Sequence, residues 1–318
     1  MKLCTFEVQT HLGGFRRLGV VFPDGVVDLN FAAALQLGNQ KHADALLPPS
    51  LLGWLEGGAR AQRTAMEAIA HLPPEMRQGN RGETLRYRWD QIRLLTPLPD
   101  ARSLRDFFAF EAHVKRGFEK RDEAMPKEWY EMPVYYQTGH HNLIGSGRDV
   151  LWPRFTERFD YELELAAIIG REGRNVKAEH AREYIAGYTI LNDFSARDIQ
   201  KREMKVRLGP AKGKHWCSGL GPWMVTVDEI PDPYELVMTA RVNGEEWSRG
   251  YSGDLHWKFE EMIEFLSWDD TIYPGDIIGS GTVGTGCGLE LDKWVQPGDT
   301  IELEIEKIGV LRNRVVRP

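Results

Sequence analysis

The chain has little cysteine, no long apolar run and no excess of positive charge. Its three cysteines, Cys4, Cys217 and Cys287, are odd in number and widely spaced. This argues against a disulfide framework and against a zinc site made of cysteine clusters, so we interpret all three as structural thiols. No apolar stretch approaches the roughly 18–20 residues that cross a membrane, and the N-terminal residues lack the apolar core of a signal peptide. We therefore expect a cytoplasmic protein without a membrane partner.

Charge and composition narrow the class further. The net charge is −7 and the pI is about 5.8, and no basic tract is present, so we expect no nucleic-acid partner. An anionic substrate would need local positive charge or a metal ion. The 318 residues, of which 42% are hydrophobic and 27% charged, are typical of a globular protein with one large domain and one smaller domain.

Periodicity and turn signals divide the chain near residue 98. Residues 1–30 alternate apolar and polar side chains, which predicts short strands, and residues 31–72 place apolar side chains three and four apart, which predicts helices. Two prolines within residues 94–101 then mark a boundary. The predicted domains are residues 1–97 and residues 98–318.

The second part is predicted to be rich in strands. Residues 105–120 have helical spacing with Asp106 near the start, and residues 121–157 are rich in loops. Beyond residue 160 most segments predict strands, including residues 289–295 and 300–308, with few helices between them. This pattern favours a β-rich α+β fold over a doubly wound α/β fold.

Acidic residues in the run 159–169 are the most informative feature. Glu162 and Glu164 lie on one face of a predicted strand, and Asp193 follows a second predicted strand. Two neighbouring acids repel unless a cation lies between them, and Mg²⁺, Mn²⁺ or Ca²⁺ accepts several carboxylate oxygens at roughly 2.0–2.6 Å. The alternative is a solvated strand face for the glutamates and a helix cap for Asp193. Glu302, Glu304 and Glu306 show the same alternation, and we expect them to face solvent.

Other motifs allow a functional and a structural interpretation. His113 has the pKa range of a general base but could equally be a packing residue. Arg197 and Asp198 are expected to form a simple ion pair, and Lys214 is either solvated or binds a substrate carboxylate. The run 279–284 has the spacing G-x-G-x-x-G, but no helix is predicted to follow it, so it argues only weakly for a dinucleotide site.

Five motifs in one order resemble the fumarylacetoacetate hydrolase family. They are RDFFAFEAHV (residues 105–114), DYELELAAIIG (160–170), NDFSARDIQ (192–200), LGPAKGK (208–214) and GDIIGSGT (275–282). The resemblance covers residues 98–318, and the N-terminal part resembles the extra domain of longer members. It implies a mixed β-sandwich roll with a small N-terminal α/β domain, and a homodimer.

The resemblance also implies a set of site residues. Asp106, Glu162, Glu164 and Asp193 match the metal-binding acids. His113 matches the catalytic histidine, and Lys214 a catalytic lysine. Glu290 matches the acid that holds the histidine, although it could equally be an acid on a strand face. Matches to substrate-binding positions are Gln200, Thr282, Arg121 and Tyr136. Met204 departs from the family pattern, where a substrate-contacting tyrosine is usual, and this argues against fumarylacetoacetate itself as the substrate.

The activity implied by the resemblance is metal-dependent hydrolysis of a C–C bond in a small 2,4-dioxo acid. In that scheme His113 activates a water molecule, and an enolate is the leaving group. Decarboxylation or tautomerisation of a 2-oxo diacid, and dehydration of a 2-keto-3-deoxy sugar acid, are alternatives within the family. An alternative outside the enzymes is a non-catalytic protein that binds a metal or a small acid.

Overall fold

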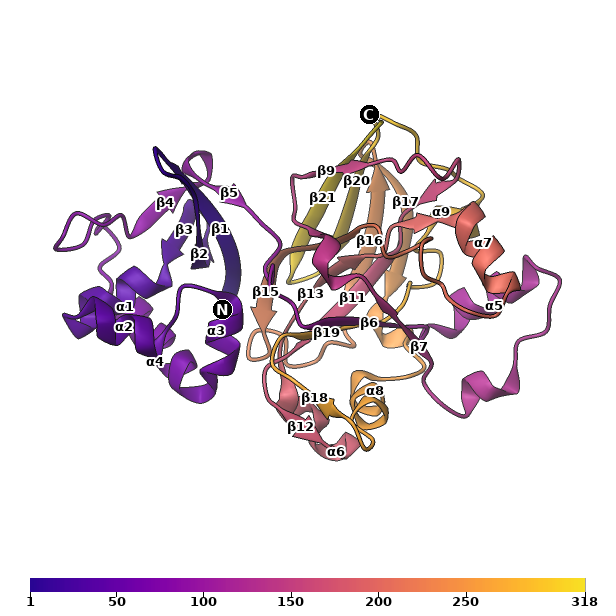
Figure 1. Ribbon diagram of the computed structural model, residues 1–318, viewed down its shortest axis with the longest axis horizontal. Helices are drawn as coiled ribbons and strands as arrows, with labels where there is room; N and C mark the ends of the chain where they lie inside the picture. Colours follow the sequence, from indigo (N-terminus) through magenta and orange to yellow (C-terminus); the bar gives the residue numbers. More distant parts are fainter. Residues whose placement is uncertain (318) are drawn as a thin grey trace.

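A twelve-stranded sheet runs through the molecule and joins its two lobes. The computed structural model describes residues 1–317, with the N-terminal residues in the smaller lobe (Figure 1). The strand order is β4-β3-β2-β1-β15-β13-β11-β19-β6-β7, with β5 paired to β1 and β8 to β15. The bounds are β1 (Lys2–Thr10), β2 (Gly13–Phe22), β3 (Gly25–Asp28), β4 (Arg86–Arg88), β5 (Arg93–Leu94), β6 (Ser103–Phe107), β7 (Tyr135–Thr138), β8 (Leu143–Ile144), β11 (Leu163–Ile169), β13 (Ile185–Asn192), β15 (Ser218–Thr226) and β19 (Asp276–Gly279).

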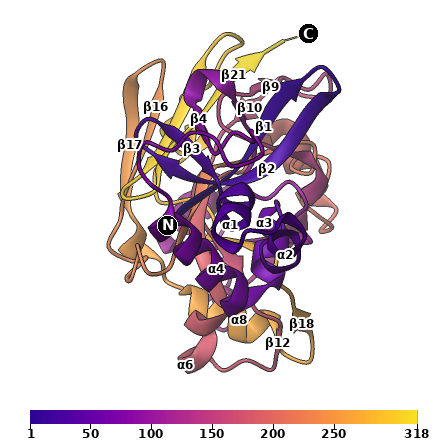
Figure 2. The same ribbon diagram turned by 90° about the vertical axis from the view of Figure 1, so that its left-hand side faces the viewer.

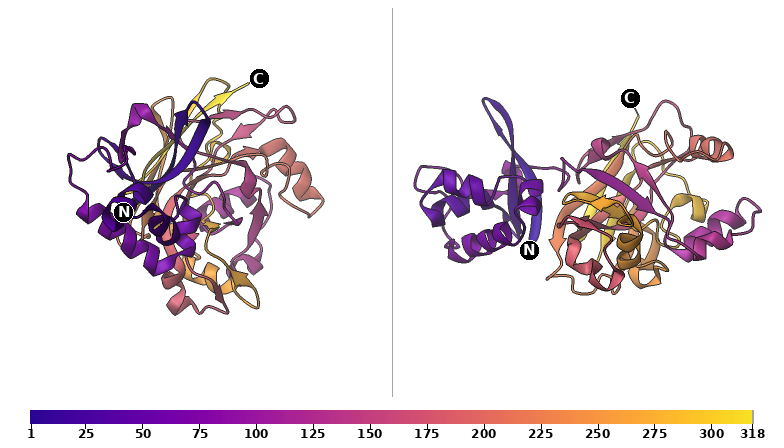
Figure 3. Two further views of the ribbon diagram at one scale, coloured as in Figure 1. Left: turned by 60° about the vertical axis from the view of Figure 1, so that its left-hand side comes forward. Right: turned by 60° about the horizontal axis from the view of Figure 1, so that its bottom comes forward.

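The two lobes meet where β1 pairs with β15. Lys2 lies opposite Val225 and Leu3 opposite Met224 in this antiparallel pairing, and the right-hand view of Figure 3 shows the lobes side by side. Because one sheet crosses the proposed boundary, the division into residues 1–97 and 98–318 stays a prediction.

A second sheet and two short ladders complete the larger lobe. The order of the second sheet is β17-β16-β20-β21-β9. Its strands are β9 (Asp149–Leu151), β16 (Val237–Val242), β17 (Glu245–Tyr251), β20 (Thr300–Ile305) and β21 (Gly309–Val316). The short ladders pair β10 (Phe159–Asp160) with β14 (Ser195–Ala196) and β12 (Gly173–Arg174) with β18 (Thr271–Ile272).

Helices α1–α4 belong to the smaller lobe and lie in front in Figure 2. The Asp28 side chain accepts the N–H of Phe31 at 3.0 Å and so caps α1, which ends at Gly38 with φ 64°. The helices are α1 (Leu29–Leu37), α2 (Gln40–Leu46), α3 (Leu51–Glu56), α4 (Gly58–His71), α5 (Glu111–Glu119), α6 (Ala178–Ala181), α7 (Arg197–Lys205), α8 (Phe259–Leu266) and α9 (Gly288–Leu291). Short 3₁₀ turns are η1 (Trp89–Gln91), η2 (Lys127–Tyr130), η3 (His140–Asn142), η4 (Arg182–Tyr184) and η5 (Ser252–Asp254).

Strand β11 lies at the centre of the large sheet and is buried on both faces. Leu163 and Leu165 pack into the core between the two sheets. Ala166 and Ile168 pack on the opposite face, in the cluster that includes α1–α4. Since side chains alternate along a strand, Glu164 lies on the same face as Ala166 and Ile168. A carboxylate is therefore placed inside the protein, which requires a compensating partner.

The β-rich α+β fold is confirmed, with 35% of residues in strands and 27% in helices. The acids on β20 alternate with buried Ile301, Leu303 and Ile305 and face solvent as expected, where Glu304 pairs with Arg241. Among residues 1–317, no helix has the length and apolar character required to cross a membrane.

Two predicted elements were wrong. Residues 103–107 form β6 rather than the start of a helix, and α5 begins only at Glu111. Pairing of β6 with both β19 and β7 outweighs the helical spacing of its apolar residues. Residues 288–291 form α9 rather than a strand, because the Asp160 carboxylate accepts the first N–H groups of this turn, from Gly288 at 2.8 Å and Leu289 at 3.0 Å.

Candidate metal centre and catalytic dyad

Three buried carboxylates from different parts of the large sheet converge. Asp106 lies on β6, Glu164 lies on β11, and Asp193 directly follows β13. Each offers an oxygen atom, and the three atoms lie within 4.8 Å of one another. The three side chains are at most 2% exposed. The sheet therefore brings together three of the four acids that the sequence predicted as metal ligands.

Strand β19 sets the spacing of these acids. Gly279 lies opposite Asp106 on one side and Ala166 on the other. A Cβ atom at position 279 would lie 2.4 Å from Asp106 Oδ1, so only glycine leaves room for this carboxylate. The N–H of Gly281 donates to the same oxygen at 3.3 Å. Gly279 and Gly281 thus accommodate and hydrogen-bond the Asp106 carboxylate. A dinucleotide site would need a helix directly after β19, and none follows there.

The pKa values of all three carboxyl groups are raised. Burial raises the pKa of Asp106, while hydrogen bonding with Glu164 and the charge of Lys214 oppose the rise. Burial and the negative charges of Asp106 and Asp193 raise the pKa of Glu164 well above its ordinary value. Burial also raises the pKa of Asp193 well above its ordinary value, against the charge of Lys214. Such crowding is unfavourable unless protons or a cation separate the acids.

The donor set fits a hard divalent cation. Within the described residues, Glu164 Oε2 and Asp193 Oδ1 are buried without a hydrogen-bond partner. Carboxylate oxygens are the ligands that Mg²⁺, Mn²⁺ and Ca²⁺ prefer, and a cation would satisfy both oxygens at once. Asp106, Glu164 and Asp193 can therefore hold a divalent metal ion.

Glu162 lies beside this trio but is paired with positively charged side chains. Its Oε1 is 2.8 Å from Arg197 Nη2, and its Oε2 accepts a hydrogen bond from Lys214, whose Nζ also lies 2.5 Å from Asp193 Oδ2. Burial opposes ionisation of Glu162, but the charges of Arg197 and Lys214 outweigh it and hold its pKa well below the ordinary value. Its role as a direct metal ligand stays a prediction.

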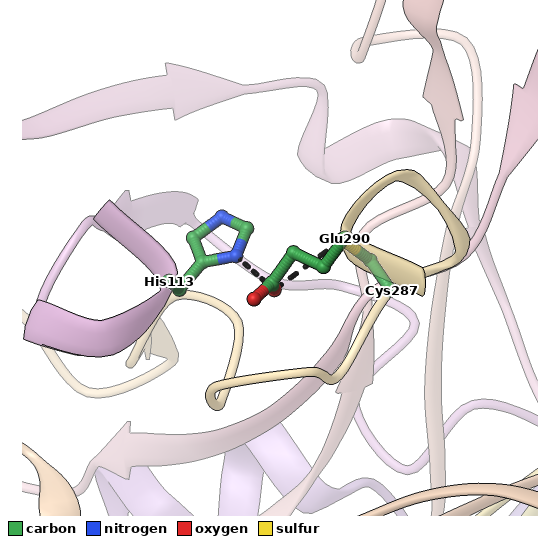
Figure 4. A group of neighbouring side chains, drawn as sticks. All are labelled: His113, Cys287 and Glu290. Atoms are coloured by element: carbon green, nitrogen blue, oxygen red, sulfur yellow. Dashed lines mark hydrogen bonds and ion pairs between the residues drawn. The ribbon is translucent and has the colours of Figure 1, made fainter. Parts of the chain in front are cut away.

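His113 and Glu290 form a buried dyad next to the acids. His113 Nδ1 lies 2.5 Å from Glu290 Oε1, as Figure 4 shows. Glu290 Oε2 accepts the N–H of Thr285 at 3.0 Å, which fixes the carboxylate. Burial disfavours the charged form of Glu290, but hydrogen bonding and charge from His113 lower its pKa. The second ring nitrogen of His113, Nε2, lies 4.0 Å from Glu162 Oε1 and so faces Glu162.

Asp160 and Arg197 lie at the site, although the sequence analysis assigned neither of them to it. Asp160 Oδ2 lies 2.8 Å from Arg197 Nε and 2.7 Å from its Nη2. The predicted pair of Arg197 with Asp198 was wrong, because Asp198 accepts hydrogen bonds from Thr156 and from the N–H of Glu157. The sequence indicated their importance only by placing them in the motifs of residues 160–170 and 192–200. Local spacing does not reveal that Arg197 pairs with a residue 37 positions away.

Three of the four predicted substrate-binding residues lie at the site. Gln200 accepts a hydrogen bond from Arg197 at 3.1 Å, Thr282 donates to Glu164 at 3.4 Å, and the Tyr136 hydroxyl donates to Asp193. Arg121 instead pairs with Glu123 at 2.8 Å, and its side chain is 44% exposed. The structure does not bring Arg121 to the acids.

Comparison with known proteins identifies the family of this chain. The family model for the fumarylacetoacetate (FAA) hydrolase C-terminal domain matches residues 103–316. A human relative named oxaloacetate tautomerase FAHD2A, mitochondrial, is 31% identical over 327 residues, covering 99% of this chain and 92% of its own. A relative from Bacillus subtilis named oxaloacetate tautomerase YisK is 36% identical over 203 residues, covering 64% of this chain and 65% of its own.

A solved structure extends the likeness to the whole fold. The fumarylacetoacetate hydrolase from psychrophilic Exiguobacterium antarcticum superposes with a TM-score of 0.72 at 26% identity, covering 99% of this chain and 100% of its own. The family match covers the segment that supplies all four acids and both dyad residues. The chain therefore belongs to the fumarylacetoacetate hydrolase family.

Proposed function

We propose that this protein is a divalent-metal-dependent enzyme that interconverts the keto and enol forms of a 2-oxo diacid such as oxaloacetate. The observation that carries the proposal is the dyad: Glu290 holds His113 Nδ1 at 2.5 Å and leaves Nε2 facing Glu162, which lies beside the acid trio. A neutral imidazole held in this way has its basic lone pair on Nε2. The dyad is therefore a base directed at the bound substrate.

Asp106, Glu164 and Asp193 would hold Mg²⁺ or Mn²⁺, or Ca²⁺ as a third candidate. Glu162 would join them if Lys214 moved onto the substrate. When bound, the cation would polarise the 2-oxo group and offset the charge that develops on its oxygen. A 2-oxo acid therefore suits the donor set of the site, and the substrate is a small keto acid.

The residues of the chain then have separate tasks. His113 Nε2 removes a proton from carbon 3 of the keto form, and the protonated ring returns a proton to the oxygen on carbon 2, which gives the enol. Glu290 keeps the ring oriented and stabilises its charged form. Lys214 and Thr282, which donate hydrogen bonds to Asp193 and Glu164, would stabilise negative charge on the substrate. No water molecule is consumed, and the same groups catalyse the reverse reaction.

The choice of substrate rests on the relatives. Two proteins named oxaloacetate tautomerases match this chain, one of them over 99% of its length. Hydrolysis of a C–C bond in a 2,4-dioxo acid, the activity preferred from the sequence, becomes the second candidate. It is favoured by the similarity to a solved fumarylacetoacetate hydrolase. In that reaction the dyad would deprotonate water, which attacks the distal carbonyl, and the departing carbon would be protonated.

A substrate panel separates the two candidates. Oxaloacetate, acylpyruvates and 2-keto-3-deoxy sugar acids are incubated with the protein and Mg²⁺ or Mn²⁺, with and without a chelator. Enol absorbance and deuterium uptake at carbon 3 report tautomerisation, and product masses report hydrolysis, decarboxylation or dehydration. We expect keto–enol exchange of oxaloacetate faster than in protein-free buffer and sensitive to chelator. Cleavage of acylpyruvates without this exchange would replace the first candidate by the second.

Assembly and location remain predictions. A homodimer is inferred from the family resemblance alone, and light scattering of the purified chain would test it. The human relative is described as mitochondrial, whereas the sequence of this chain predicts a cytoplasmic protein. Fractionation of cells that produce the full chain would decide between these locations.

A further inference from the structure

Cys287, Glu290 and His113 form a second buried group of metal-ligating residues, which Figure 4 shows. The Cys287 thiol donates to Glu290 Oε1 at 3.5 Å, and His113 Nδ1 contacts the same oxygen at 2.5 Å. One ligand atom from each residue lies within 4.8 Å of the other two. None of the three residues is more than 8% exposed. The backbone holds the group together, because Cys287 forms a β-bridge with Glu162 and precedes α9.

We propose that these three side chains form a site for zinc or another thiophilic divalent cation, with water as the fourth ligand. Zinc binds thiolate, imidazole and carboxylate at roughly 2.0–2.3 Å in tetrahedral geometry, which places the donor atoms roughly 3.3–3.6 Å apart. The Cys287 and Glu290 atoms already have this separation, at 3.5 Å. His113 Nδ1 and Glu290 Oε1, which lie 2.5 Å apart, must separate by about 1 Å.

The two groups of ligands select different cations. The Asp106, Glu164 and Asp193 trio offers only oxygen atoms, which suit hard cations such as Mg²⁺ and Mn²⁺. The Cys287 group offers sulfur, nitrogen and oxygen, which suit zinc. A hard cation in the first site therefore does not compete for the second, and zinc binding is measurable in protein saturated with Mg²⁺.

Zinc at this site changes the tautomer of the catalytic histidine. The Cys287 thiol loses its proton to solvent and binds as thiolate. The His113 Nδ1 lone pair binds the ion, so the one proton of the neutral ring lies on Nε2. Nε2 is the nitrogen that faces Glu162, and with a proton it accepts no second one from the substrate. Zinc is thus an inhibitor of the enzyme. This consequence rests on the proposed function, whereas binding of the ion does not.

Cobalt substitution tests the site without any assay of activity. A thiolate bound to Co²⁺ gives a charge-transfer absorption band in the near ultraviolet, and a site made only of oxygen atoms gives none. We expect this band when Co²⁺ is titrated into the full chain saturated with Mg²⁺. Cys287→Ser and His113→Ala should abolish it, while Cys217→Ser, which alters another buried thiol, should keep it. Circular dichroism establishes that each variant is folded.

Absence of the band in the unaltered protein, or its persistence in a folded Cys287→Ser variant, would overturn the proposal. Zinc inhibition then tests the consequence. Relative to its own zinc-free rate, Cys287→Ser should need roughly 10- to 100-fold more zinc for half inhibition than the unaltered chain. If the cobalt band is present and zinc leaves turnover intact, the site stands and the role of His113 as the base is wrong.

Discussion

Arg197 lies between Asp160 and Glu162, with its Nη2 2.7 Å from Asp160 Oδ2 and 2.8 Å from Glu162 Oε1. Asp160 also accepts the first N–H groups of α9, the turn that carries Glu290. One buried aspartate is therefore connected, through Arg197, to Glu162 beside the acid trio and, through α9, to the acid of the dyad. The two halves of the site are positioned by the same contacts.

Asp160→Asn should disturb both halves of the site. The amide retains the shape of the side chain but removes the charge that balances buried Arg197, and breaking a buried ion pair costs about 3 kcal/mol or more. We expect that loss in the free energy of unfolding, measured by chemical denaturation, together with a fall in kcat. Asp198→Asn is the matched control, since Asp198 lies one residue from Arg197 but accepts hydrogen bonds from Thr156 and from the N–H groups of Glu157 and Ile199 instead. Equal effects of both substitutions would contradict the special role of Asp160.

His113→Ala and Glu164→Ala should separate catalysis from metal binding. Loss of a general base typically slows a reaction by roughly 10²- to 10⁴-fold, and we expect this for His113→Ala with Mn²⁺ affinity retained. Glu164→Ala removes one of the three converging oxygen ligands, so both affinity and activity should be lost. Calorimetric titration with Mn²⁺ and initial rates measure the two properties. Undiminished activity in either variant would end the proposed mechanism.

Metal binding should release protons. Burial raises the pKa values of Asp106, Glu164 and Asp193, so the metal-free folded protein retains protons that an unfolded carboxyl group would lose above about pH 4. The contribution of these groups to the free energy of unfolding is therefore largest below about pH 4 and falls as the pH rises from there through their raised pKa values. A bound cation requires ionised carboxylates, so metal affinity should fall as the pH is lowered.

Calorimetry in two buffers with different ionisation enthalpies measures these protons directly. The apparent binding enthalpy should differ between the buffers by an amount proportional to the protons released. Thermal stabilisation by Mg²⁺ should also be larger at pH 8 than at pH 5. Identical enthalpies in both buffers would show that the three acids are already ionised without metal.

The sequence indicated which acids lie close together but not which side chains pair with them. Alternation along an extended chain predicts that Glu162 and Glu164 share one face; Glu164 lies on β11 and Glu162 directly precedes it. Alternation does not show that Lys214 and Arg197 pair with Glu162, or that Asp106 lies beside Glu164 and Asp193. These contacts join segments that are far apart in the chain. The same limit explains α9. Its residues have the pattern of a strand, but the distant Asp160 accepts hydrogen bonds from the N–H groups of its first turn and so favours a helix.

Gly279→Ala tests whether the spacing of the acids depends on β19. The added Cβ would lie 2.4 Å from Asp106 Oδ1 and 2.8 Å from Leu191 Cδ2, so the carboxylate must move out of the trio. We expect Mn²⁺ affinity to fall by roughly 10- to 100-fold, the size usual when a metal ligand loses its support. Gly117→Ala in α5 is the control, since its nearest atom is the flexible end of Arg121 at 3.6 Å. That substitution should retain affinity and stabilise the helix by about 0.5–1 kcal/mol. Full metal affinity in Gly279→Ala would mean that Asp106 is not a ligand.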